Sequence, residues 1–359
     1  MLIRSITFLL IAFMFTGCGS ASESDQPIIT DERGDDADSQ NDNNSNEVIV
    51  IPPDEESNES EETTVPINYS WSAPELLESE GGEAGLPSVD INSQGDTVVA
   101  WTQKEGTAIN VHVTYISSTG AEITSTLNDP LTKSKIAESN YIYYKRPYAV
   151  VSINETGQAF TAWTSILIEE SNMNGAYVAS FNLADNSWNA PVQISSEANS
   201  MIDMKINDSG MAAIVWTQAS GNGNQLFISQ YSNANATWSD PILLSTGSIS
   251  SPQVALTSTG HSVIVFEEYS SELSANHIYA MEVDASGVKS SKHKIDTQAS
   301  SAGELIVNIN DDNQIAVSWL QDDDLNEQTD PWVASYSSGA WTEAVKINSE
   351  HGTTTIALA

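Results

Sequence analysis

Apolar and polar positions alternate in short runs through residues 67–359, and nearly the same run occurs five times. The copies read INSQGDTVVAWTQ, INETGQAFTAWTS, INDSGMAAIVWTQ, LTSTGHSVIVFEE and INDDNQIAVSWLQ. Alternation before a turn residue, followed by a β-branched run that ends on an aromatic side chain, predicts a tight β-hairpin. The turn residues all tolerate a left-handed backbone, and they are Gly95, Gly157, Gly210, Gly260 and Asn313.

Large apolar side chains stand at fixed distances from each turn. The aromatic residues after the turns are Trp101, Trp163, Trp216, Phe266 and Trp319. Before the turns stand the pairs Val89/Ile91, Val151/Ile153, Met204/Ile206, Val254/Leu256 and Val307/Ile309. This strict register favours core packing of the tryptophans over stacking on sugars. We therefore expect both sets to line the core.

A second hairpin follows each copy. We place Tyr115, Phe181, Tyr231, Met281 and Tyr336 at one register of its first strand. Its second strand begins with Trp188, Trp238 and Trp341, and Ile123 and Val288 are expected in that place in copies one and four. Each copy is then four antiparallel strands. Such a small sheet is stable only against neighbours, so the copies are expected to stack around an axis.

The sequence thus predicts an all-β protein: a β-propeller of four-stranded antiparallel blades, with five full blades. Residues 71–79 read as a lone outer strand, and residues 353–359 read as a lone inner strand. The two could form a partial sixth blade from both termini, which would remove open edges. Alternatively, they are extra coverage on a five-bladed ring.

The segment SNANATW, residues 232–238, resembles the Asp-box turn Ser-x-Asp-x-Gly-x-Thr-Trp of sialidase-like bacterial propellers. It keeps Ser232, Thr237 and Trp238 but lacks the Asp and the Gly. The resemblance covers roughly residues 70–359 and implies the propeller fold. Sialidase activity would require a cluster of arginines to hold the substrate carboxylate. Because Arg146 is the only arginine in residues 67–359, sialidase activity is not expected.

The first residues predict export. Residues 1–17 combine Arg4, an apolar run and small residues, which is typical of a signal peptide. FTGC closely resembles the lipobox of bacterial lipoproteins, and this implies that Cys18 becomes the lipidated first residue. Gly19 after it suits the outer membrane or cell surface. Residues 18–66 are rich in Ser, Asn, Asp and Glu, so we expect an acidic, disordered tether.

Charge and composition narrow the partners. The chain has 49 Asp and Glu against 12 Lys and Arg, a net charge of −37. Such a surface repels nucleic acids and anionic lipid headgroups. A single cysteine excludes an internal disulfide and a CxxC site. The scattered histidines do not predict a zinc site, and we expect no cofactor.

The longer connections should all lie on one rim of the ring, where binding is expected. The segment 131–148 gathers aromatic and basic side chains on that rim. Aromatic rings beside positive donors suit sugars, carboxylates or a protein hot spot. The alternative is that the tyrosines extend a strand or cover the edge of the ring, and that the lysines only keep the loop soluble. The candidate ligand-binding residues are Tyr141, Tyr143, Tyr144, Lys145, Arg146 and Tyr148.

A second loop of the rim, residues 322–330, carries Asp322, Asp324 and Asn326 at alternating positions. These match the start of a calcium loop. However, Glu327 stands where the glycine should be and the terminal glutamate is missing, so an EF-hand is excluded. A looser calcium site is the weaker interpretation here, and a solvated acidic loop is favoured.

No nucleophile elbow, P-loop or HExxH motif is present. The sequence therefore favours a surface-tethered, non-catalytic propeller that binds a glycan or a protein. One alternative is a glycoside hydrolase or lyase that uses a carboxylate pair at the mouth of the ring. Another is a structural component of the envelope.

Overall fold

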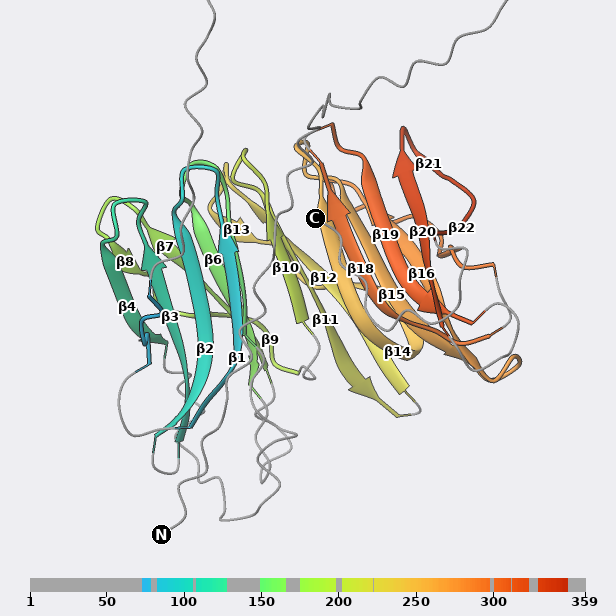
Figure 1. The fold of residues 1–359 in the computed structure, drawn as a ribbon, viewed down its shortest axis with the longest axis horizontal. Coiled ribbons are helices and arrows are strands. Elements are labelled where there is room, and N and C mark those ends of the chain that lie inside the picture. Colours follow the sequence, from blue (N-terminus) through green and yellow to red (C-terminus); the bar gives the residue numbers. More distant parts are fainter. Residues whose placement is uncertain are drawn as a thin grey trace, which may run out of the picture. The chain divides into compact units, whose positions relative to one another are not determined.

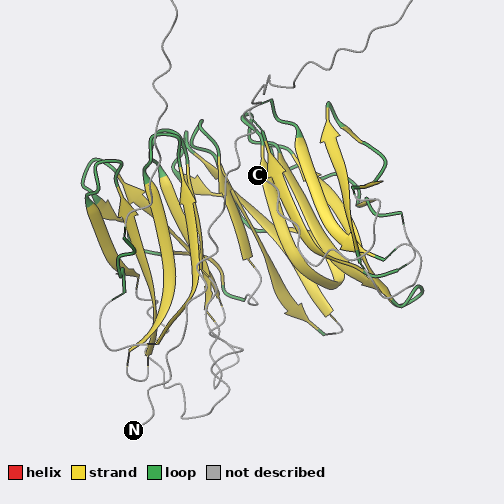
Figure 2. Cartoon of the chain, in the orientation of Figure 1, coloured by secondary structure: helices red, strands yellow, loops and turns green. Residues whose placement is uncertain are grey.

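The computed structural model describes residues 73–78, 83–105, 108–127, 149–165, 175–197, 202–221, 223–297, 300–310, 312–322 and 329–347. The chain divides into two units, and all of these residues belong to the second, Ala73–Ala359. The signal peptide, Cys18, the tether and the predicted strand 353–359 lie outside the described residues. Within the described part no helix is present, so none could cross a membrane (Figure 2).

The strands follow the repeats, and we call the strands of each repeat a module. Module 1 has the order β1-β2-β3-β4. Its strands are β1 (Glu83–Ile91), β2 (Thr97–Glu105), β3 (Ala108–Ile116) and β4 (Glu122–Leu127). Module 2 has the order β5-β6-β7-β8, and β9 also pairs with β7. Its strands are β5 (Ala149–Ile153), β6 (Ala159–Ser165), β7 (Gly175–Asn182), β8 (Ser187–Trp188) and β9 (Val192–Ser195).

Modules 3 and 4 are joined into one 8-stranded sheet, because β14 (Ile242–Leu256) belongs to both. It is the outer strand of module 3 and then the first strand of module 4. Module 3 also contains β10 (Ile202–Ile206), β11 (Ala212–Ser220), β12 (Gly223–Ser232) and β13 (Thr237–Trp238). Module 4 continues with β15 (Ser262–Ser270), β16 (Ala275–Val283) and β17 (His293–Lys294). The sequence predicts long connections from one module to the next, and this prediction is wrong for modules 3 and 4, because β14 joins them directly.

Module 5 has the order β18-β19-β20-β21, with β22 also paired to β20 (Figure 1). Its strands are β18 (Ala302–Ile309), β19 (Ile315–Gln321), β20 (Asp330–Ser337), β21 (Ala340–Trp341) and β22 (Val345–Lys346). All neighbouring strands are antiparallel. The five predicted four-stranded repeats are therefore present as modules.

The predicted turns adopt the expected backbone. Each residue at the tip has a positive φ: Gly95 (88°), Gly157 (79°), Gly210 (75°), Gly260 (81°) and Asn313 (60°). An L residue other than Asn or Asp is strained there, which explains the choice of glycine and asparagine. The turns therefore fix the register of the first hairpin in every module.

Apolar clusters lie between successive modules. One joins modules 1 and 2, another modules 2 and 3, and two more join modules 3 to 4 and 4 to 5. The indoles of Trp101, Trp163, Trp216 and Trp319 are buried, which confirms their assignment to the core. Among the described residues each module thus buries its face against the next one along the chain.

The first Val/Ile pair is an exception. Val89 and Ile91 are 66% and 63% exposed, whereas Val151 and Ile153 are buried. The prediction that all five pairs line the core was therefore wrong for module 1. In modules 2 to 5 this face packs on the preceding module, and the described residues contain no module before β1.

Two register assignments were also wrong. The residue that pairs with the second position after the turn is Ile116 in module 1 and Val283 in module 4. In the other modules this residue is Phe181, Tyr231 or Tyr336. Tyr115 and Met281 are therefore one residue out of this register. Across from Ile116 and Val283 lie Glu122 and Lys289. These charged residues, and not Ile123 and Val288, take the place of the tryptophans. A shift of one residue turns a side chain to the opposite face of the sheet.

Prolines interrupt the outer edge of modules 2 and 3. Pro191 separates β8 from β9, and Pro241 separates β13 from β14. Proline has no N–H for the ladder, so it breaks the pairing there. Of the predicted outer strand at 71–79, the described residues 73–78 contain no strand.

Candidate functional site

The strand directions give the modules two unlike edges. We call the edge with the tips of the first hairpins, Gly95 to Asn313, the turn edge, and the opposite edge the connection edge. The strands that flank residues 106–107, 128–148, 166–174, 198–201, 298–299 and 323–328 all end at the connection edge. The expectation that the long connections share one edge is therefore confirmed by the topology.

A ladder of asparagine side chains joins the modules at the turn edge. Asn92 Nδ2 donates to the carbonyl of Asn154 (3.1 Å), Asn154 Nδ2 to Asn207 (3.0 Å) and Asn207 Nδ2 to Thr257 (2.8 Å). The Oδ1 of each asparagine accepts from its own turn, for example from Gln158 N (2.9 Å). All three side chains are buried. The ladder therefore connects modules 1 to 4 at the turn edge and satisfies these three buried amides.

A second row of side chains connects the first strands. Asp90 Oδ2 accepts from Ile153 N (3.0 Å), and Ser152 Oγ accepts from Ile206 N (3.2 Å). Asp203 Oδ2 accepts from Val254 N (2.9 Å). A first strand has a free backbone edge, so these side chains supply the partners that another strand would provide.

Asp203 is the most perturbed carboxylate of this row. Burial raises the pKa of Asp203 above its ordinary value, and the charge of Asp90 acts in the same direction. The nearby Lys205 and the N–H of Val254 oppose this shift. The raised pKa means that the carboxyl group of Asp203 binds a proton more tightly in the folded protein than in the unfolded chain.

We expect Asp203→Asn to stabilise the fold at neutral pH. Because the folded pKa is raised, the stability contributed by the protonated acid is fully present below about pH 4 and is lost as the pH rises through the folded pKa. The amide cannot ionise, and its Oδ1 can still accept from Val254. Urea unfolding should show a more stable variant at about pH 7 and convergence with the parent in acid. An equal difference at both pH values would contradict this account, and exposed Asp240→Asn is the control.

The predicted binding residues Tyr141, Tyr143, Tyr144, Lys145, Arg146 and Tyr148 all lie outside the described residues. So do Asp324 and Asn326 of the possible calcium loop. Asp322 is described, at the connection edge, where Ser300 Oγ donates to its backbone carbonyl. In the described part of the chain no group of three or more His, Cys, Asp or Glu side chains could hold a metal ion. The structure therefore leaves both binding predictions untested.

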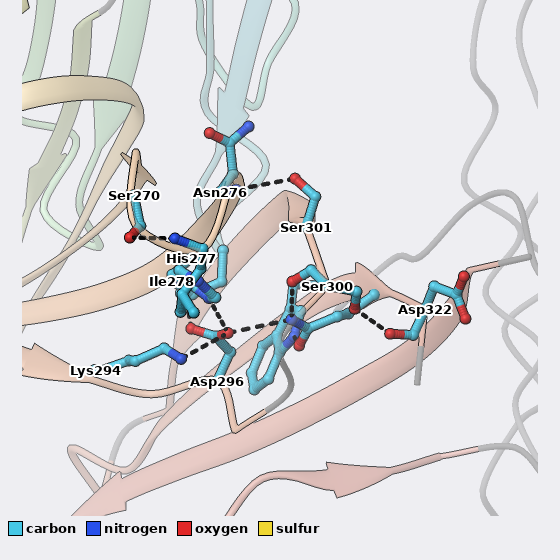
Figure 3. Close-up of polar contacts among 12 residues, drawn as sticks. Ser270, Asn276, His277, Ile278, Lys294, Asp296, Ser300, Ser301 and Asp322 are labelled. Atoms are coloured by element: carbon cyan, nitrogen blue, oxygen red, sulfur yellow. Dashed lines mark hydrogen bonds and ion pairs between the residues drawn. The ribbon is translucent and has the colours of Figure 1, made fainter. Parts of the chain in front are cut away.

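A buried polar cluster joins modules 4 and 5 near the connection edge. His277 donates from Nδ1 to Asp296 Oδ2 (2.7 Å), and the backbone N–H of Ile278 donates to Asp296 Oδ1 (2.8 Å). Lys294 Nζ lies 3.6 Å from Asp296 Oδ2. Figure 3 shows Asp296 between Lys294 and His277. The side chains of His277 and Asp296 are 1% and 0% exposed, so this contact is shielded from solvent.

Gln321 extends this cluster into module 5. Its Nε2 donates to Asp296 Oδ2 (3.1 Å) and to the carbonyl of Ser300 (2.7 Å). Its Oε1 accepts from the indole Nε1 of Trp319 (3.1 Å). One amide therefore connects the core indole, the buried carboxylate and the chain that leads into β18.

Module 5 has a similar pair. Lys346 lies opposite Trp332, as Lys294 lies opposite Tyr279. Lys346 Nζ is 2.7 Å from Oδ2 of Asp330, whose side chain is fully buried. Both carboxylates are buried, whereas the two lysine side chains are 34% and 20% exposed. The buried contacts therefore fix the end of β19 and the entry to β18.

The pKa values of two tyrosines are raised, and these are Tyr336, which contacts the neighbouring module, and Tyr115, which lies beside a turn. Burial, with the nearby Glu282 carboxylate, raises the pKa of Tyr336 to about 12. Tyr336 OH donates to Glu282, so the contact joins modules 5 and 4. Burial, with Asp96, raises the pKa of Tyr115 to about 12. Both hydroxyls act as hydrogen-bond donors in the folded protein and are not poised for proton transfer near neutrality.

A short sequence motif marks part of this cluster. Three copies end in Trp-x-Gln, at residues 101–103, 216–218 and 319–321. In two of them the indole donates to the glutamine Oε1, from Trp101 to Gln103 (3.3 Å) and from Trp319 to Gln321 (3.1 Å). Gln218 differs, since its Nε2 donates to Glu197 (2.5 Å). The contact of Gln321 with Asp296 depends on the packing of two modules, which the motif cannot specify.

Comparisons with known proteins find similarity to solved structures and none to curated sequences. No family model matches the chain, and no curated protein sequence matches it. A Hadza microbial sialidase is similar in structure with a TM-score of 0.44 and 11% identity, over 75% of this chain and 59% of that chain. This chain thus matches 59% of the length of that sialidase.

Two other similar structures are a polysaccharide lyase and an arabinanase. An ulvan lyase has a TM-score of 0.49 and 10% identity, over 76% of this chain and 74% of that one. The α-L-arabinanase of Penicillium chrysogenum has a TM-score of 0.41 and 12% identity, over 71% and 89%. At these values no activity or residue role is transferred to this chain.

Proposed function

We propose that residues 67–359 form a β-propeller that binds a glycan or a protein through its connection edge, without catalysis. The observation that supports this is the difference between the two edges. The turn edge is cross-linked by buried asparagines, whereas the chain at the connection edge is elaborated by segments of very different length. Variable connections on a rigid scaffold are the usual location of binding sites.

The proposed ligand-binding residues are those of the longest connection, between β4 and β5. Tyr141, Tyr143, Tyr144 and Tyr148 supply flat apolar rings, and Lys145 and Arg146 supply positive donors. Positive charge is scarce in a chain of net charge −37, so its concentration here would select an anionic or hydroxyl-rich ligand. Asp322, Asp324 and Asn326 would add a weak calcium site to the same edge.

We further propose that acyl chains on Cys18 hold the protein at the outer membrane or cell surface. Residues 18–66 would then act as the tether. More than one acyl chain is needed for stable anchoring, as the lipobox resemblance implies. This arrangement would leave the modules free to reach ligands away from the lipid.

A second candidate function is hydrolysis or elimination of a glycan by a carboxylate pair. Among the described residues Asp90 and Asp203 favour it most, because both lie in the row of first strands and the charge of Asp90 acts on Asp203. Both carboxylates are already bonded to backbone N–H groups of the next module. Turnover that Asp203→Asn abolishes would support this function in place of simple binding.

The main test measures binding by the secreted Cys18→Ser protein on glycan and protein arrays. We expect Tyr143→Ala, Tyr144→Ala and Arg146→Ala together to weaken binding at least about tenfold, as expected for loss of aromatic and arginine anchors. The matched control changes three exposed turn-edge residues, Thr119→Ala, Leu183→Ala and Asn235→Ala. Equal binding by both triple variants would refute the connection-edge site, and so would loss only in the control.

A further inference from the structure

Module 5 carries an asparagine at the ladder position that is not used between modules, whereas in module 4 that position is held by Thr257, which has no amide donor. Asn310 occupies the ladder position of its turn, since its Oδ1 accepts from Gln314 N (2.9 Å) as Asn154 Oδ1 accepts from Gln158 N. Yet Asn310 is exposed, and its Nδ2 donates to Gln314 Oε1 (2.9 Å) within the same turn. Asn92, Asn154 and Asn207 instead donate to the next module and are buried.

The row of first strands ends in the same way. The side-chain amide of Gln253 in module 4 forms two hydrogen bonds with β18. Its Oε1 accepts from Val307 N (2.9 Å), and its Nε2 donates to Leu305 O (2.8 Å). In module 5 Asn308 stands where Asp90 stands in module 1, and each accepts from the following N–H (3.1 Å). Asp90 also holds β5, whereas among the described residues Asn308 holds no other strand.

The apolar face of module 5 is also incompletely covered. Val263 and Ala280 of module 4 are 0% and 1% exposed, because module 5 packs on them. The residues at the same positions in module 5, Ala316 and Val333, are only half-buried. Among the described residues, two polar rows and one apolar face thus lack the same neighbour, which is a strand beside β18.

The chain after β22 has the alternating pattern for that strand and is one residue shorter than the corresponding part of β14, whose pairings contain two register shifts. Val345 takes the position of Ile242, since they lie opposite Val333 and Ile228. From Ile242, β14 continues to the first-strand pair Val254 and Leu256 without a break. The alternating pair Ile356 and Leu358 also follows Val345 along the chain. Its separation from Val345 is one residue shorter than the separation of Val254 and Leu256 from Ile242.

We propose that residues 353–359 lie along β18 as a sixth first strand. Ile356 and Leu358 would face Ala316 and Val333, as Val307 faces module 4. Asn308 would bond the backbone of Leu358, and Asn310 Nδ2 would donate to the carbonyl after it, continuing both rows. The proposal concerns the end of the module array and is independent of any ligand at the connection edge.

Cysteine labelling tests the alternation that this strand requires. Cys18→Ser removes the natural thiol, and Ile356→Cys or Ala357→Cys then adds one thiol to the full chain. We expect Ile356→Cys, which faces module 5, to react at least about tenfold more slowly than Ala357→Cys, because adjacent strand residues point to opposite faces. Equal rates at the two positions would overturn the proposal.

Asn310→Asp tests the ladder itself. Aspartate keeps the Oδ1 that accepts from Gln314 N but loses the Nδ2 donor. We expect it to speed the labelling of Ile356→Cys several-fold, with the control Asn154→Asp having little effect there. Unchanged labelling in Asn310→Asp would refute the role of Asn310. Protection that disappears on dilution would show that a second copy covers β18, and this too would overturn the proposal.

Discussion

Replacing Asp296 by alanine should destabilise the protein by about 3–5 kcal/mol, the usual cost of removing one partner from a buried ion pair. The carboxylate accepts from His277 Nδ1, from Ile278 N and from Gln321 Nε2, and its side chain is 0% exposed. Without it, the donors of both modules lose their acceptor in a site that water does not reach. Urea unfolding at about pH 7 measures the effect.

Asp240→Ala is the control for this experiment, because Asp240 is exposed. It should change the free energy of unfolding by no more than about 0.5 kcal/mol. A loss below about 1 kcal/mol for Asp296→Ala would mean that water enters the cluster and satisfies the donors. The join between modules 4 and 5 would then rest on apolar packing alone.

Trp216→Ala should be equally damaging, by about 3–5 kcal/mol, because it removes a large fully buried side chain from between modules 2 and 3. Its ring stacks on Phe227 with centroids 5.7 Å apart. No hydrogen bond to its Nε1 is present in the described structure, so the loss is one of packing. Thermal and denaturant unfolding both report it.

The matched substitution Trp238→Ala affects a half-buried indole of the outer strand and should cost clearly less. Phenylalanine separates packing from hydrogen bonding. Trp319→Phe leaves Gln321 Oε1 without the indole donor and should cost about 1–3 kcal/mol more than Trp216→Phe. Equal losses for the two phenylalanine variants would contradict the role given to Gln321.

The repeated sequence motif makes the modules predictable, because the residues within each copy determine its turn and its strands. A left-handed turn needs Gly95 or its equivalents, and the alternation around it places Trp163 and Trp216 on a buried face. The prediction of burial failed where burial depends on a neighbouring module. Val89 and Ile91 match the other pairs in sequence but are exposed, since burial depends on a preceding module that the repeat itself cannot reveal.

Single-residue shifts were the other source of error. Ile123 and Val288 are apolar and seemed to replace the missing tryptophans, yet the register places Glu122 and Lys289 there. With a period of two, neighbouring residues compete for the same assignment, and only the pairing decides. The proposed binding residues 141–148 stay a prediction, because they lie outside the described residues.

The contacts between modules were beyond sequence reasoning for a physical reason. Asn92 and Asn154 are common turn residues, and their Oδ1 atoms do what asparagine does in any such turn. Their second role, donation to the next module, requires the distance between two hairpins. The same holds for His277 and Asp296, which are separated along the chain and meet only when β16 pairs with the outer strand.

Strand β14 has a practical consequence for engineering. Ile242–Leu256 runs as one strand from module 3 into module 4. The two modules therefore cannot separate or rotate without breaking backbone hydrogen bonds between β14 and its neighbouring strands. A reporter domain or epitope inserted near Gly247 would break both pairings at once. Under mechanical load, modules 3 and 4 should therefore yield together, as a single event in a force trace.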